Sequence, residues 1–421
     1  MDAAEIKALA DAIIARSKAD HVEVSISSSD QRWIRFANNG VTTNGDTTNR
    51  SVSVTTHFGK RSGTASGNQF GGEDLDALVA RAEELAQLAP EDPESMPGLE
   101  PQTYDEVPGW QEPSGLEAMA NGVGASLEVA RDRGLTVAGF ARQSSGWTSY
   151  TTNLGLFGLH RTGDATVSQT MRTSDGRGSG WSNHAAGRAE DLDYAGVAQR
   201  AADKAQRSLD VQPLEPGDYP VILEPACVAN MVNLLSWSLS ARSADEGRSW
   251  IAGKDGSKLG QRVFSESVNL TSDPGSPLAR GAAWGEDGLP QAPRTWVKDG
   301  VLQTLARGRF WAAESQQEAV PRPPNLLMAG GEKSMEDLIA STERAVLITS
   351  LWYIRSVAPQ QLLYTGLTRD GVFWVEDGKI THALPNFRWN DSPLQVFSRI
   401  CLLYTSPSPR DLSTSRMPSS A

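Results

Sequence analysis

Apolar and polar residues alternate along several segments in the first part of the chain. The apolar members of these alternations are Val22, Val24, Ile26, Ile34, Phe36, Val52 and Val54. A period of two places successive side chains on opposite faces of a strand, so these segments predict sheet strands with one buried and one wet face. Residues 1–20 instead repeat their apolar positions every three or four residues, which predicts an amphipathic helix rather than a signal peptide.

Several short sequence segments recur further along the chain, which indicates an internal repeat. The sequence Glu-Asp-Leu-Asp opens a predicted helix at residues 73–76 and occurs again at 190–193, 117 positions later. Asn44-Gly45-Asp46 and Thr162-Gly163-Asp164 lie at nearly the same offset, and helical spacing returns over residues 116–127. We expect two copies of a helix-sheet-helix unit, at 1–88 and 114–210, in an N-terminal α/β domain over 1–212.

Two breaks divide the chain. Residues 89–113 contain six prolines and many acidic residues, which predicts an extended linker that crosses a surface. A second proline-rich break precedes a β-rich domain at 215–397, in which one helix at 228–239 introduces strands joined by Asp-Gly turns. The predicted class is α+β, with a curved and largely antiparallel sheet in the second domain.

The composition changes again at the end of the chain. Residues 398–421 are rich in Ser, Pro and Arg and have no periodicity. The segment resembles translated adapter sequence at the end of a fragmentary reading frame, so we expect a non-native tail that packs against nothing and replaces the native C-terminus.

Charge and cysteine content narrow the functional classes. The formal net charge is −12, which argues against nucleic acid or an anionic membrane as a partner, because such binding needs clustered Lys and Arg. There is no apolar run long enough to span a membrane, and the two cysteines give no disulfide framework. We expect a soluble cytoplasmic protein in which Cys227 is a small buried apolar residue.

The sequence contains few motifs that indicate catalysis or metal binding. The five histidines, at positions 21, 57, 160, 184 and 382, never lie within 20 residues of one another, so the sequence contains no local metal motif. Each histidine alone is best explained as a surface or strand residue. Neither a phosphate-binding GxxxxGK[ST] loop nor a GxSxG nucleophile motif is present. We therefore expect the isolated protein to bind no stoichiometric zinc or iron.

Four blocks of the second half carry a family resemblance. In order they are GSKLGQRVFSESVNLTSDP (256–274), RPPNLLMAGGEKSMEDLI (322–339), LITSLWYIRSV (347–357) and LYTGLTRDGVFWVEDGKITHALPNFRWNDSP (363–393). They resemble the C-terminal half of the TldD/PmbA family, and the N-terminal organisation also fits, so that the resemblance covers residues 1–397. The match is to the PmbA side, also called TldE.

This resemblance implies a cytoplasmic proteolysis system. A TldD and a TldE subunit form a heterodimer with an enclosed cavity, which cleaves unfolded or ribosomally made natural-product peptides. TldD holds a metal through an HExxxH helix and a cysteine near its C-terminus. The corresponding segment here, residues 226–249, contains no histidine. The expected role is therefore a subunit with no catalytic residue and no cofactor of its own, completed by a TldD-like partner that carries zinc or another divalent metal.

One strand is our candidate for peptide contact. Alternation along residues 352–355 puts Trp352 on one face and Tyr353 with Arg355 on the other, while Arg369 and Asp370 follow at a turn. Arginine can hold a substrate carboxylate or carbonyl and tyrosine offers a flat contact, so we expect Tyr353, Arg355, Arg369 and Asp370 to bind peptide. The alternative is that Arg355 or Arg369 forms an ion pair with a neighbouring acid of the same chain.

Two other functions stay open. A stand-alone peptidase or hydrolase would use other residues, of which the acids to test are Asp245, Glu246, Glu266 and Asp273. These acids are otherwise explained as turn and surface charge. A non-enzymatic regulatory binding protein is the second alternative, in line with the family's older label as a gyrase modulator.

Overall fold

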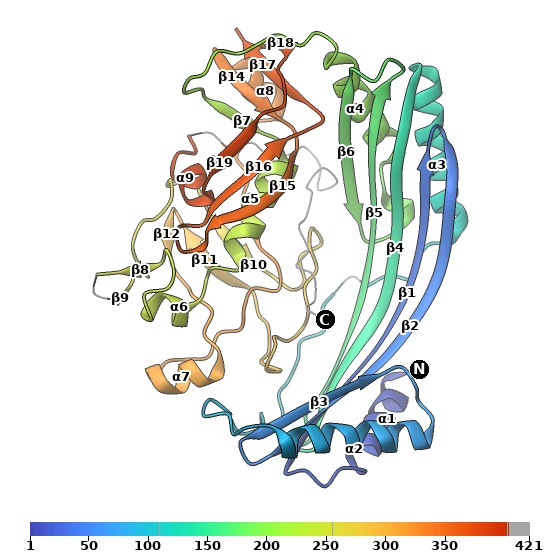
Figure 1. The fold of residues 1–421 in the computed structure, drawn as a ribbon, viewed down its shortest axis with the longest axis vertical. Coiled ribbons are helices and arrows are strands. Elements are labelled where there is room, and N and C mark those ends of the chain that lie inside the picture. Colours follow the sequence, from blue (N-terminus) through green and yellow to red (C-terminus); the bar gives the residue numbers. More distant parts are fainter. Residues whose placement is uncertain (109, 255, 402, 404–421) are drawn as a thin grey trace.

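The structure is a computed structural model that describes residues 1–108, 110–254, 256–401 and 403. Figure 1 shows a long twisted sheet in the N-terminal half, with the C-terminal half beside it. The N-terminal elements are α1 (Ala3–Ile14), β1 (His21–Ala37), β2 (Gly40–Phe58), β3 (Arg61–Gly67), α2 (Gly72–Leu88), α3 (Leu116–Asp132), β4 (Leu135–Thr152), β5 (Phe157–Thr173), β6 (Ser179–Ala186), the short 3-10 helix η1 (Ala189–Asp191) and α4 (Tyr194–Arg207).

Both sequence copies contribute to a single antiparallel sheet. Its strand order is β3-β2-β1-β4-β5-β6, so that each copy supplies three consecutive strands and the two copies meet at β1 and β4. Gly45 pairs with Trp33 across β1 and β2, and Gly163 pairs with Ser145 across β4 and β5. The two Gly-Asp sequences therefore lie in the second strand of their respective copies, as expected of a repeat.

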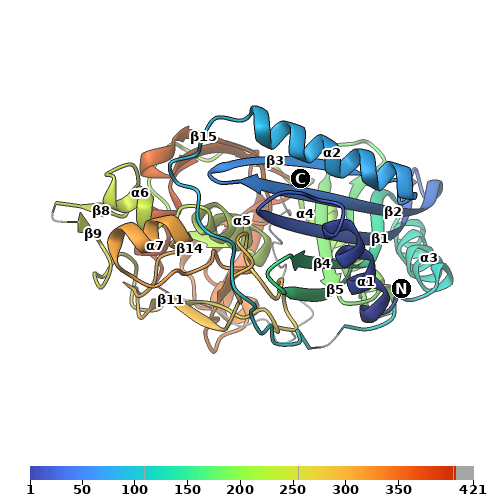
Figure 2. The ribbon, with the colours of Figure 1, turned by 90° about the horizontal axis from the view of Figure 1, so that it is seen from below.

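One face of the sheet is covered by helices. Val22, Val24 and Ile26 of β1 pack with α1 and α2, whereas Ile34 and Phe36 of the same strand pack with α3 and α4. Because all five residues have even numbers, one face of β1 serves both cores. The odd-numbered residues point to the opposite face, which Figures 1 and 2 show turned toward the C-terminal half.

The two Glu-Asp-Leu-Asp sequences end in different local structures. In the first copy Glu73 and Asp74 lie in the first turn of α2. In the second copy only Glu190 and Asp191 of the four belong to η1. Helix α4 begins after Asp193, whose carboxylate accepts a hydrogen bond from the Gly196 amide at 2.9 Å. The helix start shifts because an aspartate at the N-cap satisfies amides that otherwise have no partner.

The described residues of the C-terminal half form four small sheets. Their orders are β12-β11-β10-β13, β18-β17-β14-β7, β15-β16-β19 and β8-β9. Its strands are β7 (Val221–Leu223), β8 (Ala252–Gly253), β9 (Gly256–Ser257), β10 (Leu270–Ser272), β11 (Arg294–Lys298), β12 (Val301–Leu302), β13 (Leu327–Met328), β14 (Arg344–Ile348), β15 (Leu351–Ala358), β16 (Leu363–Thr368), β17 (Val372–Glu376), β18 (Lys379–Ala383) and β19 (Arg388–Asp391). Among these named strands only β7 and β14 pair in parallel, so the antiparallel α+β class is confirmed.

The predicted Asp-Gly hairpins are present. Asp299 and Gly300 connect β11 to β12 with φ of 49° and 73°, and Asp377 and Gly378 connect β17 to β18 with φ of 49° and 75°. Positive φ at both central residues defines the type I′ turn that suits the twist of a two-residue hairpin. Each hairpin joins neighbouring strands of one sheet, β11 with β12 and β17 with β18.

The helices of this half surround a second core. They are α5 (Pro225–Ser236), α6 (Ala241–Asp245), α7 (Arg309–Ser315), α8 (Met335–Ala340), the 3-10 helix η2 (Pro359–Gln361) and α9 (Pro393–Ser398). Helix α5 starts and ends three residues before the predicted helix at 228–239, because Pro225 is favoured in the first turn of a helix. Cys227 of α5 is fully buried, and burial raises the pKa of its thiol.

Hydrogen bonds attach the linker, residues 89–113, to the C-terminal half. The carboxylate of Glu94 accepts two hydrogen bonds of 2.6 Å from the guanidinium of Arg242. Further along, the Tyr104 hydroxyl donates to the Gly288 carbonyl at 2.6 Å. The linker thus crosses the boundary between the two halves and fixes one to the other.

The end of the chain packs more closely than predicted. Phe397 of α9 is 1% exposed, Ile400 packs against the same core, and Leu403 lies against Gly331. The prediction that the segment from residue 398 packs against nothing is therefore wrong for Ile400 and Leu403, because α9 carries the chain along the core. The remaining tail, 404–421, lies outside the described residues.

None of the helices in the described part of the chain is long and apolar enough to cross a membrane.

Two glycines of α3 offer a matched test of the helix packing. A Cβ at Gly122 would lie 2.3 Å from Cδ2 of Tyr194, which is buried, whereas a Cβ at Gly124 would meet nothing within 4 Å. We expect Gly122→Ala to lower the free energy of unfolding by about 1–3 kcal/mol through overpacking. Gly124→Ala should raise it by up to about 1 kcal/mol through helix propensity. Thermal melts check this, and equal melting temperatures for the two variants would contradict the packing.

Candidate functional site

Helix α5 begins the segment that, by the sequence resemblance, would correspond to the metal-binding helix of TldD. Its sequence, PACVANMVNLLS, contains neither histidine nor an acidic residue. A cavity of about 1180 Å³ lies beside it and is lined mainly by aliphatic and aromatic side chains. Val228 and Met231 of α5, Tyr219, Leu223 and Phe387 belong to this lining. The helix therefore offers an apolar surface, and its one thiol, Cys227, is fully buried.

The candidate strand β15 is irregular. Its pairing with β16 shifts between Trp352 and Arg355, and Tyr353 has a φ of 54°. Such a bulge ends the alternation of side chains. Trp352 and Tyr353 are both exposed, at 48% and 52%, with ring centroids 5.4 Å apart. The prediction that Trp352 lies on the face opposite Tyr353 and Arg355 is therefore wrong.

The bulge assembles two arginines and two aromatic rings into an array, which we call the β15 array (Trp352, Tyr353, Arg355 and Arg369). The Arg355 guanidinium lies 4.2 Å from the centroid of the Tyr353 ring, and that of Arg369 lies 4.4 Å from the centroid of the Trp352 ring. Cations over aromatic faces are attracted to the ring quadrupole. The structure thus groups Tyr353, Arg355 and Arg369 at one exposed place.

Asp370 has a different role from the three other predicted residues. It is 8% exposed with a φ of 55°, and it forms an ion pair with its neighbour Arg369 at 3.2 Å between Nε and Oδ2. Its other carboxylate oxygen accepts a hydrogen bond from the hydroxyl of Ser179, at the start of β6. Asp370 therefore joins the C-terminal half to the N-terminal sheet and is not displayed for a ligand.

The alternative of an ion pair within the chain applies to one arginine only. Arg369 is paired with Asp370. Among the described residues Arg355 has no ion pair, and its guanidinium donates a hydrogen bond to the Ile354 carbonyl at 3.0 Å. Arg355 is thus the cation of the β15 array that a ligand can engage most directly.

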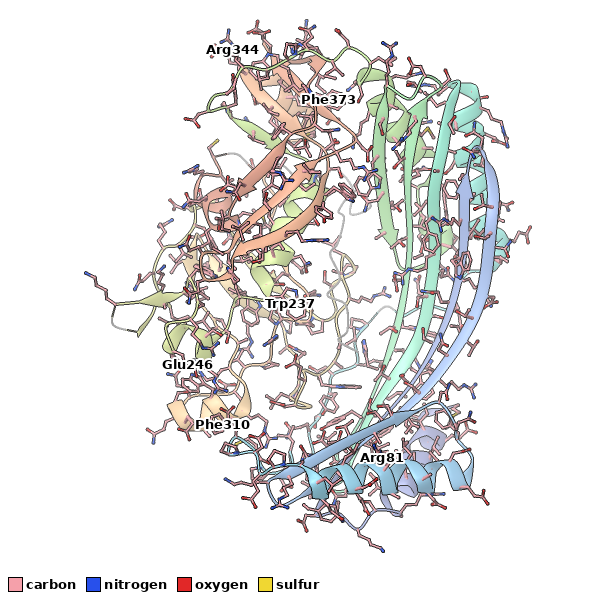
Figure 3. All side chains as sticks on the ribbon, in the orientation of Figure 1. Arg81, Trp237, Glu246, Phe310, Arg344 and Phe373 are labelled. Atoms are coloured by element: carbon pink, nitrogen blue, oxygen red, sulfur yellow. The ribbon has the colours of Figure 1, made fainter. Side chains whose placement is uncertain are left out.

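The four acids of the stand-alone peptidase alternative have local structural partners. These partners are the Trp311 indole for Asp245, Arg242 and Arg248 for Glu246, Arg262 for Glu266, and the Gly275 amide for Asp273. Figure 3 shows Glu246 at the outer side of the C-terminal half. The contacts agree with the interpretation of these acids as turn and surface charge.

Sequence spacing missed one cluster of titratable side chains. Within the described part of the chain, the single group of three His, Cys, Asp or Glu residues close enough to hold a metal is His21, Glu23 and His57. His21 and His57 are 36 positions apart but directly opposite each other across β1 and β2. The signal in the sequence was a histidine near each outer end of a predicted hairpin, which a search for local motifs does not detect.

Contacts within the cluster shift the pKa values of Glu23 and His21. Burial opposes ionisation of Glu23, but the contacts with His21, His57 and Tyr150 outweigh it and hold the pKa of its carboxyl far below the usual range. The contact with Glu23 raises the pKa of His21 in spite of burial. The Tyr150 hydroxyl donates to Oε2 of Glu23 at 2.9 Å, and burial, followed by the charge of Glu23, raises the pKa of this phenol.

Two family models match the chain. The PmbA/TldA metallopeptidase C-terminal domain matches residues 216–419, and the PmbA/TldA metallopeptidase domain 1 matches residues 22–86. The chain belongs to the TldD/PmbA family. The resemblance carried by the four sequence blocks is thereby confirmed, and the protein is related to metallopeptidases.

Three solved structures share this fold. TldE from Thermococcus kodakarensis superposes with a TM-score of 0.84 at 19% identity, covering 95% of this chain and 94% of that one. A candidate modulator of a DNA gyrase from Thermotoga maritima MSB8 gives 0.84 at 20% identity, with 95% of each chain covered. Another from Bacteroides thetaiotaomicron VPI-5482 gives 0.81 at 17% identity, covering 98% and 96%. Comparison with curated proteins gives no match.

Asp370 can be tested as the junction between the two halves of this TldD/PmbA protein. We expect Asp370→Ala to lower the free energy of unfolding by about 1–3 kcal/mol, because Ser179 and Arg369 lose a buried acceptor. Asp370→Asn should cost less, since asparagine tolerates positive φ and keeps an oxygen for the Ser179 hydroxyl. Urea melts of both variants check this order, and an unchanged Asp370→Ala melt would show that the junction contributes nothing.

Proposed function

We propose that this chain is the non-catalytic, TldE-like subunit of a TldD/TldE-type metallopeptidase that acts on unfolded or natural-product peptides. The observation that carries the proposal is helix α5. In a chain of this family, the helix that would hold the HExxxH motif has no histidine and no acid. Zinc in a catalytic site needs three protein ligands, typically histidines with a carboxylate or cysteine. The amides, hydroxyls and apolar side chains of α5 do not replace them, and its single cysteine, Cys227, is fully buried.

The β15 array supports a role in peptide contact. β15 is the edge strand of the sheet β15-β16-β19, and an edge strand has backbone groups that an extended peptide can pair with. The exposed rings of Trp352 and Tyr353 offer flat apolar contact, and Arg355 offers a cation beside them. An unfolded peptide has free backbone amides and carbonyls, which is the chemistry that such an edge recognises.

The proposed partner is a TldD-like subunit that supplies the metal and the general base. The acidic charge of −12 favours a peptide ligand over nucleic acid or an anionic membrane, and we place the complex in the cytoplasm. A stand-alone peptidase and a regulatory binding protein are the competing outcomes of the experiment below.

The proposal that only the partner is catalytic is tested by purifying the chain alone and with a TldD-type subunit. Cleavage of an unstructured peptide is then measured for both preparations. We expect no cleavage by this chain alone and cleavage by the pair, lost when the glutamate of the partner's HExxxH motif is replaced. Cleavage by the isolated chain would overturn the proposal in favour of a stand-alone peptidase. Peptide binding without cleavage by a demonstrably formed pair would favour the regulatory role.

Peptide contact is tested in the active pair with variants of the β15 array. We expect Trp352→Ala and Arg355→Ala to raise KM about fivefold to thirtyfold, the equivalent of one or two kcal/mol, with kcat and the melting temperature unchanged. Tyr353→Phe keeps the ring beneath Arg355 and should change KM less.

Arg344→Ala is the matched control, because Arg344 is an exposed arginine on β14 paired with Glu376. Its KM should equal that of the unmodified pair. If all four variants behave alike, or if activity falls only together with the melting temperature, the array is not the peptide-binding surface.

A further inference from the structure

His21, Glu23 and His57 lie on the sheet face opposite the helices, where β1 begins and β2 ends. The Nε2 atoms of His21 and His57 both point at the same carboxylate oxygen, Oε1 of Glu23, at 3.4 and 3.3 Å. Both nitrogens are buried, and in the described part of the chain neither makes a regular hydrogen bond. Three potential ligand atoms therefore lie close together, within 4.8 Å of one another.

The hydrogen bonds of Asn153 define the donor pattern of His21. The Asn153 side-chain amide donates to the Asp20 carbonyl at 3.1 Å, and its Oδ1 accepts from the Val22 amide at 3.1 Å. The same Oδ1 lies 2.8 Å from Nδ1 of His21, so Nδ1 must carry the proton. In the neutral ring Nε2 is then a bare lone pair aimed at a carboxylate. Two lone pairs that face each other need a proton or a metal ion between them.

The separations fit a metal ion. With bonds of about 2.0–2.2 Å to His nitrogen and carboxylate oxygen, ligand atoms at the corners of a tetrahedron are about 3.3–3.5 Å apart. The two distances to Oε1 of Glu23 agree with this edge length, and all three ligand atoms lie within 4.8 Å of one another. We propose that His21, Glu23 and His57 bind one divalent transition-metal ion of the zinc type, with a fourth position left for water.

The surroundings resemble the outer shell of a metal site. Asn153 orients His21, and the Tyr150 hydroxyl holds Oε2 of Glu23 at 2.9 Å, which leaves Oε1 for the metal. Hydrogen bonds of this kind fix the ligand that faces a metal. The linker closes one side, because a Cβ at Gly98 would lie 2.6 Å from the His21 ring. The side chains of His21, Glu23 and His57 are still 12%, 30% and 20% exposed, so an ion can enter.

This site is separate from helix α5 and goes beyond the proposed function. It runs against the expectation, drawn from sequence spacing, that the isolated chain binds no stoichiometric zinc or iron, and the titration below decides between the two. Its ligands lie at the start of β1 and the end of β2, and Gly98 of the linker lies beside the His21 ring. Metal binding is measured without activity, and peptide cleavage by the isolated chain is a different observation, so the two proposals fail independently.

The test uses the full chain, freed of metal with a chelator and titrated with zinc chloride by calorimetry. We expect one saturable equivalent per chain, a higher melting temperature with zinc than with chelator, and, with cobalt(II), the intense visible absorption of a four-coordinate ion. Glu23→Gln and His57→Asn should each lose the stoichiometric binding. Asn153→Ala should weaken it about 10- to 100-fold.

His382→Asn is the matched control, since His382 lies on β18 and its Nδ1 contacts the Thr381 hydroxyl. It should bind like the unmodified chain. Melts of the metal-free variants show which of them are folded. If Glu23→Gln does not fold, His57→Asn and Asn153→Ala decide. No binding of zinc in excess, or equal binding in folded His57→Asn, would overturn the site and leave only the direct contacts of the two histidines with Glu23.

Discussion

The pairing of β1 with β4 is the interaction on which the rest of the structure depends. It runs from Glu23 opposite Thr152 to Phe36 opposite Gly139 and joins the two sequence copies edge to edge. Without it each copy would be a three-stranded sheet with a long exposed edge, which invites pairing with other chains. Two glycines of β4 permit the close approach. A Cβ at Gly146 would lie 2.2 Å from the Ser28 carbonyl oxygen, and one at Gly139 would lie 2.4 Å from the Phe36 ring.

The two faces of the continuous sheet are covered by different parts of the molecule. The face that carries Val24 and Phe36 is buried under helices and supplies the cores. The other face meets the linker and the C-terminal half, where Tyr150 lies beside Gly288 and His160 lies edge-on to Trp284 at 6.2 Å. The cluster of His21, Glu23 and His57 and the β15 array both belong to this second side of the molecule. The metal-type cluster lies on the sheet itself, and Asp370, next to the β15 array, is hydrogen-bonded to β6.

Each of the two sites depends on a local feature of strand pairing. The β15 array exists because a bulge and a positive φ at Tyr353 put two aromatic rings side by side on the exposed surface. The histidine cluster exists because residues 36 positions apart are directly opposite in a hairpin. In both places the backbone arranges ordinary side chains into a group with a combined charge and shape that none of them has alone.

Local sequence determined the elements. Alternation predicted the strands around Val24 and Val54, helical spacing predicted α1, α2 and α4, and two Asp-Gly pairs predicted type I′ hairpins, because each signal acts over a few residues of backbone. The four C-terminal blocks also identified the family. Tertiary structure decided what depends on pairing and register: the union of both copies in one sheet, the bulge that moved Trp352 beside Tyr353, the packing of Ile400 on the core, and the meeting of His21 with His57. Period and spacing describe neighbours along the chain, whereas these contacts join residues that only the folded backbone brings together.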